Sequence, residues 1–172
     1  MIPMSYETRR LREREFVSMM KELLDSDQVR MMGRWKHHGP VTTLDHSLFV
    51  AFSTYRVARL LRLDVRSAVR GALLHDLYLY DSHDKSAHPG SQCFDHPRFA
   101  ARNAAALTAL TPKEKNIILS HMWPLGGPLP RSLEAWMVDL VDTVCAGLEV
   151  FRICRPSRLR KRLGVRPLIP AC

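Results

Sequence analysis

The segment from Gly71 to Tyr80 reads Gly-Ala-Leu-Leu-His-Asp-Leu-Tyr-Leu-Tyr, so the adjacent residues His75 and Asp76 stand inside an apolar run. We expect such a run to be buried. Burying an imidazole and a carboxylate is costly unless hydrogen bonds or an opposite charge offset the lost hydration. A bound metal ion would offset it. The chain therefore needs a fold whose interior holds a polar centre.

Further imidazoles and carboxylates occur in or beside segments with a helical pattern, namely His46, His96, His121 and Asp142. A single histidine on a helix is more often structural than a ligand, but together with the His-Asp pair these residues suit one or two divalent ions. Imidazole and carboxylate donors are compatible with Fe, Mn, Zn, Ni or Co. Asp139 lies three residues before Asp142 on the same helical face, so either can be the last ligand.

The order His, His-Asp, His, His, Asp resembles the HD superfamily of metal-dependent phosphohydrolases over roughly residues 39–150. The chain looks most like small bacterial HD-domain proteins of the six-ligand type. The segments that carry the resemblance are His38-Gly39, Leu44-Asp45-His46, Leu74-His75-Asp76, Asp95-His96-Pro97-Arg98 and His121-Met122-Trp123-Pro124-Leu125.

The resemblance implies a binuclear site with iron or manganese. It implies that the first ion is bound by His46, His75, Asp76 and Asp142, and the second by His96, His121 and a bridging Asp76. The segment from Leu140 to Cys145 matches the closing element of the family, which favours Asp142 over Asp139. His75 and Asp76 are then also the expected catalytic residues.

The activity implied is hydrolysis of a phosphoester or phosphoanhydride of a small molecule, such as a nucleotide or dinucleotide, through a metal-activated hydroxide. Two alternatives come from other classes. A minority of HD proteins with the same ligand pattern are oxygenases that use a mixed-valent di-iron pair. The domain could also bind metal and ligand without turnover.

Substrate phosphates need a cationic or hydrogen-bonding partner, and Lys85, Arg98 and His38 are candidates by their position near the motifs. Trp123 is a candidate wall for a nucleobase or an anchor in the core. We interpret the remaining histidines near the motifs as surface or loop groups: His37, His83 and His88.

At 172 residues the chain has the size of one domain that buries a real core. It shows neither the ~20 consecutive apolar residues of a membrane span nor the apolar segment of a secretory signal, so we expect a cytoplasmic protein. The cysteines form no Cys-x-x-Cys pair, which favours reduced thiols over a zinc site or a disulfide framework. They are Cys93, Cys145, Cys154 and Cys172.

The net charge of +9 is concentrated at the C-terminal end. Residues 152–172 contain seven basic and no acidic residues, whereas residues 38–151 contain eleven of each. This tail could bind nucleic acid or an anionic surface weakly, or be a solvated end. The oligomeric state stays open.

No segment shows the two-residue alternation of a half-buried strand, so the sequence predicts an all-α bundle of about six helices. Their expected ranges are 15–24, 42–63, 64–79, 96–109, 111–121 and 132–153, with loops at 81–95 and 123–131. Residues 1–37 should form a helical cover and residues 38–153 the metal-binding catalytic domain. Residues 154–172 should form a basic, partly irregular tail.

Overall fold

A computed structural model describes residues 6–37, 39–82, 84, 86 and 90–168. Within these ranges every regular element is a helix, and the single β feature is an isolated antiparallel bridge between Lys36 and Thr42. The predicted all-α class is confirmed. The elements are α1 (Tyr6–Asp25), α2 (Asp27–Met31), a 3₁₀ helix η1 (Met32–Arg34), α3 (Thr43–Leu61), α4 (Val65–Leu74), α5 (Gln92–Leu107), α6 (Pro112–Ser120), α7 (Leu133–Val150) and α8 (Pro156–Leu163).

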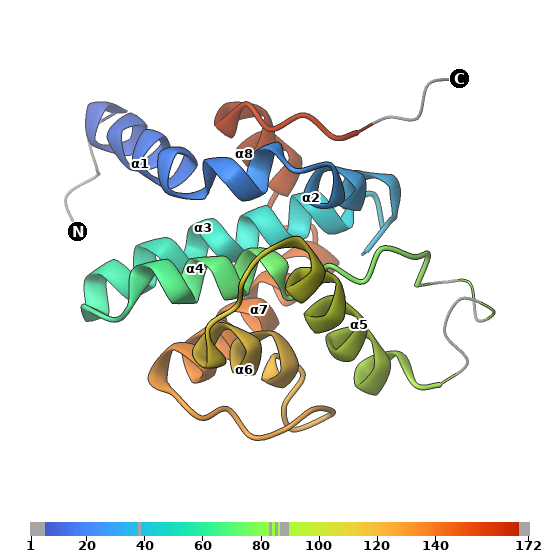
Figure 1. The fold of residues 1–172 in the computed structure, drawn as a ribbon. Coiled ribbons are helices and arrows are strands. Elements are labelled where there is room, and N and C mark those ends of the chain that lie inside the picture. The colour runs from blue at the N-terminus through green and yellow to red at the C-terminus, as the bar shows by residue number, and fades with distance from the viewer. Residues whose placement is uncertain (1–5, 38, 83, 85, 87–89, 169–172) are drawn as a thin grey trace.

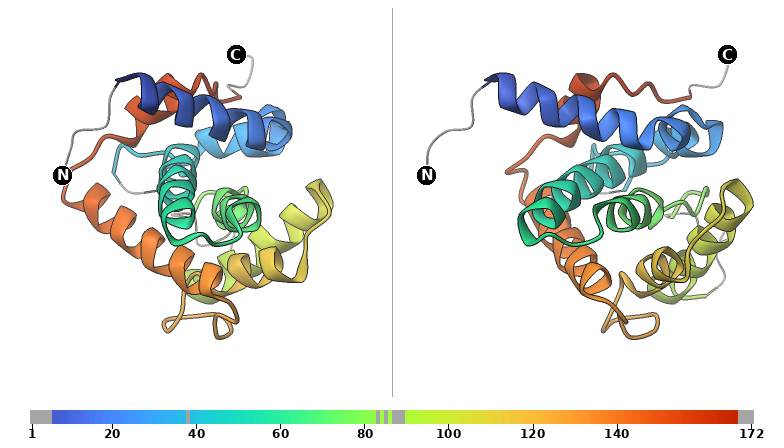
Figure 2. Two further views of the ribbon diagram at one scale, coloured as in Figure 1. Left: turned by 90° about the vertical axis from the view of Figure 1, so that its left-hand side faces the viewer. Right: turned by 60° about the vertical axis from the view of Figure 1, so that its left-hand side comes forward.

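The two central helices, α3 and α4, lie side by side between two groups of helices (Figures 1 and 2). One group comprises α1, α2 and α8, and the other comprises α5, α6 and α7. Helix α3 packs against α4, α7 and α8, while α4 also packs against α6. Tyr55 of α3, Leu73 of α4 and Ile117 of α6 are among the large side chains that this arrangement buries completely.

Side-chain caps fix where several helices begin. The Thr42 hydroxyl accepts a hydrogen bond from the backbone N–H of Asp45 at the start of α3. Helix α6 begins with a capping box in which Thr111 and Glu114 each bond the other's backbone N–H. Such caps satisfy N–H groups that have no partner within the helix. These two starts agree with the sequence prediction.

The tail was expected to be partly irregular over residues 154–172, and the structure adds a helix within it, α8, that was not predicted. Proline is compatible with the first helical turn, and Pro156 occupies it. Leu159 and Leu163, four residues apart, are both buried, so packing stabilises this short helix. Gly164 ends it at a positive φ of 73°. Together with α2, this helix raises the count above the predicted six.

Two further boundaries differ from the prediction. Helix α4 ends at Leu74 rather than near residue 79, because Tyr78 donates its backbone N–H to the carbonyl of Asp76 at 2.8 Å in a tight turn. Helix α5 begins at Gln92 rather than at His96, which places Pro97 inside the helix. Both shifts affect candidate site residues, because His75 and Asp76 follow the end of α4 and His96 lies within α5.

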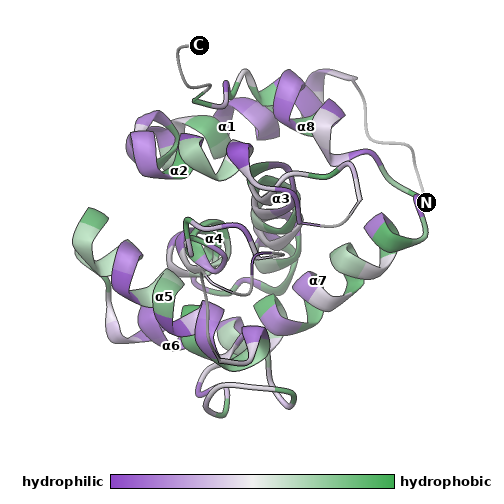
Figure 3. Cartoon of the chain, turned by 90° about the vertical axis from the view of Figure 1, so that its right-hand side faces the viewer, coloured by the Kyte–Doolittle hydropathy of each residue, from purple (hydrophilic) through white to green (hydrophobic). Residues whose placement is uncertain are grey.

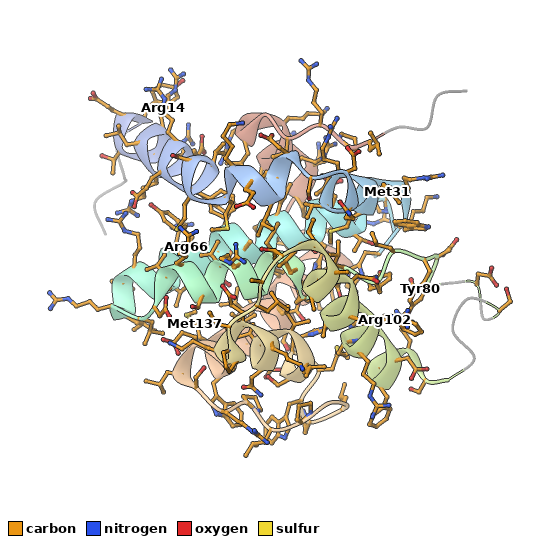
Figure 4. The ribbon with its side chains drawn as sticks, viewed as in Figure 1. Arg14, Met31, Arg66, Tyr80, Arg102 and Met137 are labelled. Carbon is orange, nitrogen blue, oxygen red and sulfur yellow. The ribbon has the colours of Figure 1, made fainter. Side chains whose placement is uncertain are left out.

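The polarity of the helices differs strongly. Helices α1 and α8 are polar, whereas α7 is apolar (Figure 3). The arginines labelled in Figure 4 are all exposed, namely Arg14, Arg66 and Arg102. Among the described residues no helix combines the length and hydrophobicity needed to cross a bilayer.

Candidate metal centre

The central pair, His75 and Asp76, lies just after the last turn of α4. His75 is the C-cap residue, and its ring Nδ1 lies 2.7 Å from the carbonyl of Ala72. The last carbonyls of a helix lack partners within it, so the imidazole N–H satisfies one of them. Since the helix has ended, the two neighbouring side chains are not forced about 100° apart as they would be within it. Both are buried and face the same centre.

His121 repeats this arrangement at the end of α6. It is the C-cap residue, and its Nδ1 lies 2.8 Å from the carbonyl of Ile118. In α5, the Nδ1 of His96 lies 2.5 Å from the carbonyl of Gln92. A carbonyl oxygen only accepts, so each Nδ1 donates a hydrogen, and in the neutral ring Nε2 then carries the lone pair. Ligating histidines are typically held this way, with the second ring nitrogen bonded to a carbonyl or carboxylate.

His46 on α3 is held by a carboxylate instead. Its Nδ1 lies 3.0 and 3.1 Å from the two oxygens of Glu149 on α7, and its Nε2 lies 2.9 Å from Oδ1 of Asp142. Glu149 is 4 % exposed. Glu149 was not among the predicted site residues. A glutamate near the end of a helix is ordinarily a surface residue, and no feature of the sequence marks this one as buried.

The two oxygens of Asp76 face two different pairs of histidines. Its Oδ2 lies 3.4 Å from Nε2 of His75 and 3.9 Å from Nε2 of His46. Its Oδ1 lies 3.4 Å from Nε2 of His96 and 3.6 Å from Nε2 of His121. Asp76 therefore stands between two sets of nitrogen donors that come from four helices or their ends.

These separations fit a metal centre better than a hydrogen-bonded cluster. An N–H···O hydrogen bond spans about 2.7–3.2 Å, whereas two ligands about 2.0–2.2 Å from one ion lie within about 4.4 Å of each other. The buried Nε2 of His75 and Oδ2 of Asp76 have no hydrogen-bond partner. The Nε2 atoms of His96 and His121 lie only 2.7 Å apart, close enough to share one hydrogen or to bind one cation together. The donor set therefore fits divalent cations.

The electrostatics favour ionised carboxylates. Burial acts to lower the pKa of His46 and of His75, but the neighbouring carboxylates raise both, Asp142 and Glu149 for His46 and Asp76 and Asp142 for His75. Burial acts to raise the pKa of Asp76, but the neighbouring imidazoles, His75 foremost, hold it well below its ordinary value. Burial also acts to raise the pKa of Asp142, yet His75 and His46 lower it. Burial and the positive charge of nearby His75 lower the pKa of His121 to about 3. Two carboxylates are thus ionised, and His121 stays neutral at physiological pH.

Asp142 and Asp139 lie in different surroundings. Oδ1 of Asp142 lies 2.9 Å from Nε2 of His46 and 3.5 Å from Nε2 of His75. Asp139 lines a separate apolar groove between α3 and α7. The structure brings Asp142 to the other candidate ligands and leaves Asp139 apart from them.

His37 lies at this centre too, although the sequence analysis interpreted it as a loop group. Its Nδ1 lies 3.7 Å from Oδ2 of Asp76, and its ring stacks on that of His46 with 4.2 Å between the ring centroids. Ligand atoms of His37, His46 and Asp76 lie within 4.8 Å of one another. The residue follows η1 in a segment without helical periodicity, so no pattern pointed to it.

A cavity of about 380 Å³ opens beside the centre. His96, His121 and Asp142 line one side, and Met122, Trp123 and Leu125 form an apolar wall. Trp123 also packs edge-to-face on Trp136 of α7, with 4.7 Å between the ring centroids. Polar groups at the cavity come from Tyr78, Ser82 and Gln92.

Of the three substrate-binding candidates, Arg98 is the one that lies in the described part of the chain. Its side chain is exposed and does not line this cavity. Lys85 and His38 lie outside the described residues, as do His83 and His88.

A family model described as HD domain matches residues 43–147, a range that contains the six candidate ligands named from the sequence. The chain belongs to the HD domain family. The resemblance inferred from the sequence is therefore confirmed. No curated protein and no solved structure gives a significant match to the chain. HD domains bind divalent metals and are typically metal-dependent hydrolases, and this HD domain carries histidine and aspartate groups that could hold such an ion.

Proposed function

We propose that the protein is a metal-dependent phosphohydrolase that acts on a phosphoester or phosphoanhydride of a small molecule of nucleotide size. The observation that carries this proposal is the position of Asp76, whose two oxygens face separate histidine pairs at 3.4–3.9 Å. A carboxylate in this position suits a bridge between two ions. Membership of the HD domain family supports the reaction class.

In this proposal His46, His75, Asp76 and Asp142 would hold the first ion. His96, His121 and Asp76 would hold the second. Iron and manganese are the proposed metals, since imidazole and carboxylate ligands suit both. A pair of divalent ions supplies a nucleophile from water at neutral pH and neutralises charge on the attacking and leaving oxygens of a phosphoryl group.

The chain's own groups keep this centre in a single arrangement. Backbone carbonyls hold the Nδ1 hydrogens of His75, His96 and His121, so each Nε2 points toward the centre. The Glu149 carboxylate fixes the ring of His46 in the same sense. Outer partners of this kind set the orientation and basicity of metal ligands.

The cavity indicates what the substrate resembles. Its volume of about 380 Å³ is at the small end of the roughly 300–1,000 Å³ of ligand pockets, which favours a mononucleotide-sized substrate over a dinucleotide. The indole of Trp123 and the side chains of Met122 and Leu125 offer an apolar surface to a flat organic group. Among the described lining residues none is lysine or arginine, so phosphate charge would be met at the metal centre.

The test begins with elemental analysis of freshly purified protein alongside the Asp76→Asn variant, which keeps the shape of the side chain but loses its charge. We expect about two equivalents of metal per chain in the parent and a loss in the variant. Release of inorganic phosphate is then measured with nucleoside monophosphates and nucleoside triphosphates, and formation of nucleotide products is measured with dinucleoside polyphosphates. Metal-dependent release, fastest with a monophosphate and absent in Asp76→Asn, would support the proposal.

Other outcomes would overturn it. If the iron-loaded protein consumed dioxygen and released no phosphate, the centre would be that of an oxygenase. If the protein held its metal but turned over neither phosphoesters nor dioxygen, the domain would be a binding module. If neither protein bound metal after reconstitution, the whole catalytic interpretation would fail.

A further inference from the structure

His37 is a histidine at the metal centre that neither the ligand pattern read from the sequence nor the proposed function uses. It lies between η1 and α3 in the chain. Its side chain is 19 % exposed, whereas that of His46 beneath it is 1 % exposed. His37 also lines the cavity. It is therefore the outermost of the imidazoles that reach Asp76 from this side.

Its distance from Asp76 is that of a fellow ligand. The Nδ1 of His37 and Oδ2 of Asp76 are 3.7 Å apart, longer than a hydrogen bond of about 2.7–3.2 Å. Two atoms bound to one ion at about 2.0–2.2 Å can lie at this separation. Oδ2 of Asp76 is the same oxygen that faces His46 and His75. His37 therefore lies near Oδ2 of Asp76, as His46 and His75 do, whereas His96 and His121 lie near Oδ1.

The backbone holds His37 in this position. Its N–H donates to the carbonyl of Val41 at 2.8 Å, and the antiparallel bridge between Lys36 and Thr42 lies directly beside it. Its ring then stacks on His46 with an interplanar angle of 30°. Two backbone constraints and one ring contact therefore direct the imidazole toward the centre.

We infer that His37 is a further protein ligand of the first ion, beside His46 and Oδ2 of Asp76, since the ligand atoms of these three residues lie within 4.8 Å of one another; this inference rests on the proposed function. The first ion would then have one protein ligand more than the sequence pattern gives it.

The cavity borders both parts of the centre, because His37, Asp76 and Asp142 line it together with His96 and His121. His37 would therefore bind its ion on the side of the centre that faces the cavity.

The experiment isolates the first ion. In the full chain, His121→Gln removes a ligand of the second ion, and Co²⁺ is titrated as the probe while its visible absorption is recorded. Into this background we introduce His37→Phe, which keeps a ring against His46 but has no nitrogen. Lys36→Gln serves as the matched control, because Lys36 is exposed on the same segment. His37→Asn is a second variant in case the phenylalanine prevents folding, as judged by circular dichroism.

We expect His37→Phe to weaken Co²⁺ binding by about tenfold or more and to change the absorption spectrum, with Lys36→Gln unchanged. The same affinity and spectrum in the folded His37 variants as in the background would overturn the inference. Failure of the proposed function is recognised separately. In that case the parent chain, with every histidine intact, binds no metal or binds metal without releasing phosphate.

Discussion

Nε2 of His96 lies 2.7 Å from Nε2 of His121, and both rings commit their Nδ1 hydrogens to backbone carbonyls. Burial, followed by the charges of His75 and His96, lowers the pKa of His121 to about 3, so this ring is not protonated at neutral pH. At this distance the two nitrogens can share at most one hydrogen. A bound divalent ion would instead be held by both nitrogens. The folded state should therefore depend on metal.

Metal removal should lower thermal stability. At a free ion concentration about 100 times the Kd, binding adds about 2.7 kcal/mol to the free energy of unfolding. For a chain of this size that corresponds to roughly 5–10 °C in Tm. We expect a chelator to lower the Tm of the parent by about this amount and re-added metal to restore it, as followed by circular dichroism. An unchanged Tm would argue against a bound ion.

Glu149→Gln should weaken metal binding without unfolding the protein. The Glu149 carboxylate accepts the hydrogen of His46 Nδ1, and loss of such outer partners typically costs 10–100-fold in metal affinity. Titration with metal checks this, and Glu22→Gln on the exposed surface of α1 is the control. Equal affinities of the two variants would show that Glu149 has no role in orienting His46.

Asp139→Asn should stabilise the protein at neutral pH. Burial, followed by the charge of Asp142, raises the pKa of Asp139 from 3.8 to about 6. The folded state thus holds this proton more tightly, and the stability that it contributes is present below pH 4 and lost as the pH rises through 6. An asparagine carries no charge at any pH. We expect a gain on the order of 1 kcal/mol at pH 8 and little gain at pH 4 from denaturant unfolding. A gain of equal size at both pH values would contradict this explanation.

Gly71→Ala should destabilise the crossing of α4 and α6. A Cβ at Gly71 would lie 2.6 Å from Cγ2 of Ile117, and overpacking of this kind costs about 1–3 kcal/mol. Gly147 in α7 has open space around the same position, so Gly147→Ala should instead stabilise by about 0.5–1 kcal/mol. Urea unfolding of both variants compares the two sites directly. Destabilisation by both substitutions would mean that packing at residue 71 is not the cause.

The sequence predicted the class of the fold because helix starts and apolar spacing are local signals. Thr42 and Thr111 cap helices where the pattern placed them. The sequence did not predict α8. This short helix is stabilised because Leu159 and Leu163 are buried against the rest of the fold. The end of α4 at Leu74 could not be predicted from local pattern either, because Leu77 and Leu79 continue the apolar run past it.

The candidate site, like the fold, could be predicted only in part. His75 and Asp76 stood out because polar residues inside an apolar run require a partner. Glu149 and His37 gave no such signal, since each lies where a surface residue would be ordinary. Only the tertiary arrangement brings Glu149 to His46 from 103 residues away. Contacts between residues so far apart in the sequence depend on how α3 and α7 pack, and a local sequence pattern does not predict that packing.

The edge-to-face contact between Trp123 and Trp136 gives the protein an intrinsic optical reporter. One indole lines the cavity, and the other belongs to α7, the helix that also carries Asp142 and Glu149. A molecule that enters the cavity changes the surroundings of the first ring and its coupling to the second. Tryptophan fluorescence and near-ultraviolet circular dichroism can therefore register occupancy of the cavity without a labelled ligand and before any product is formed.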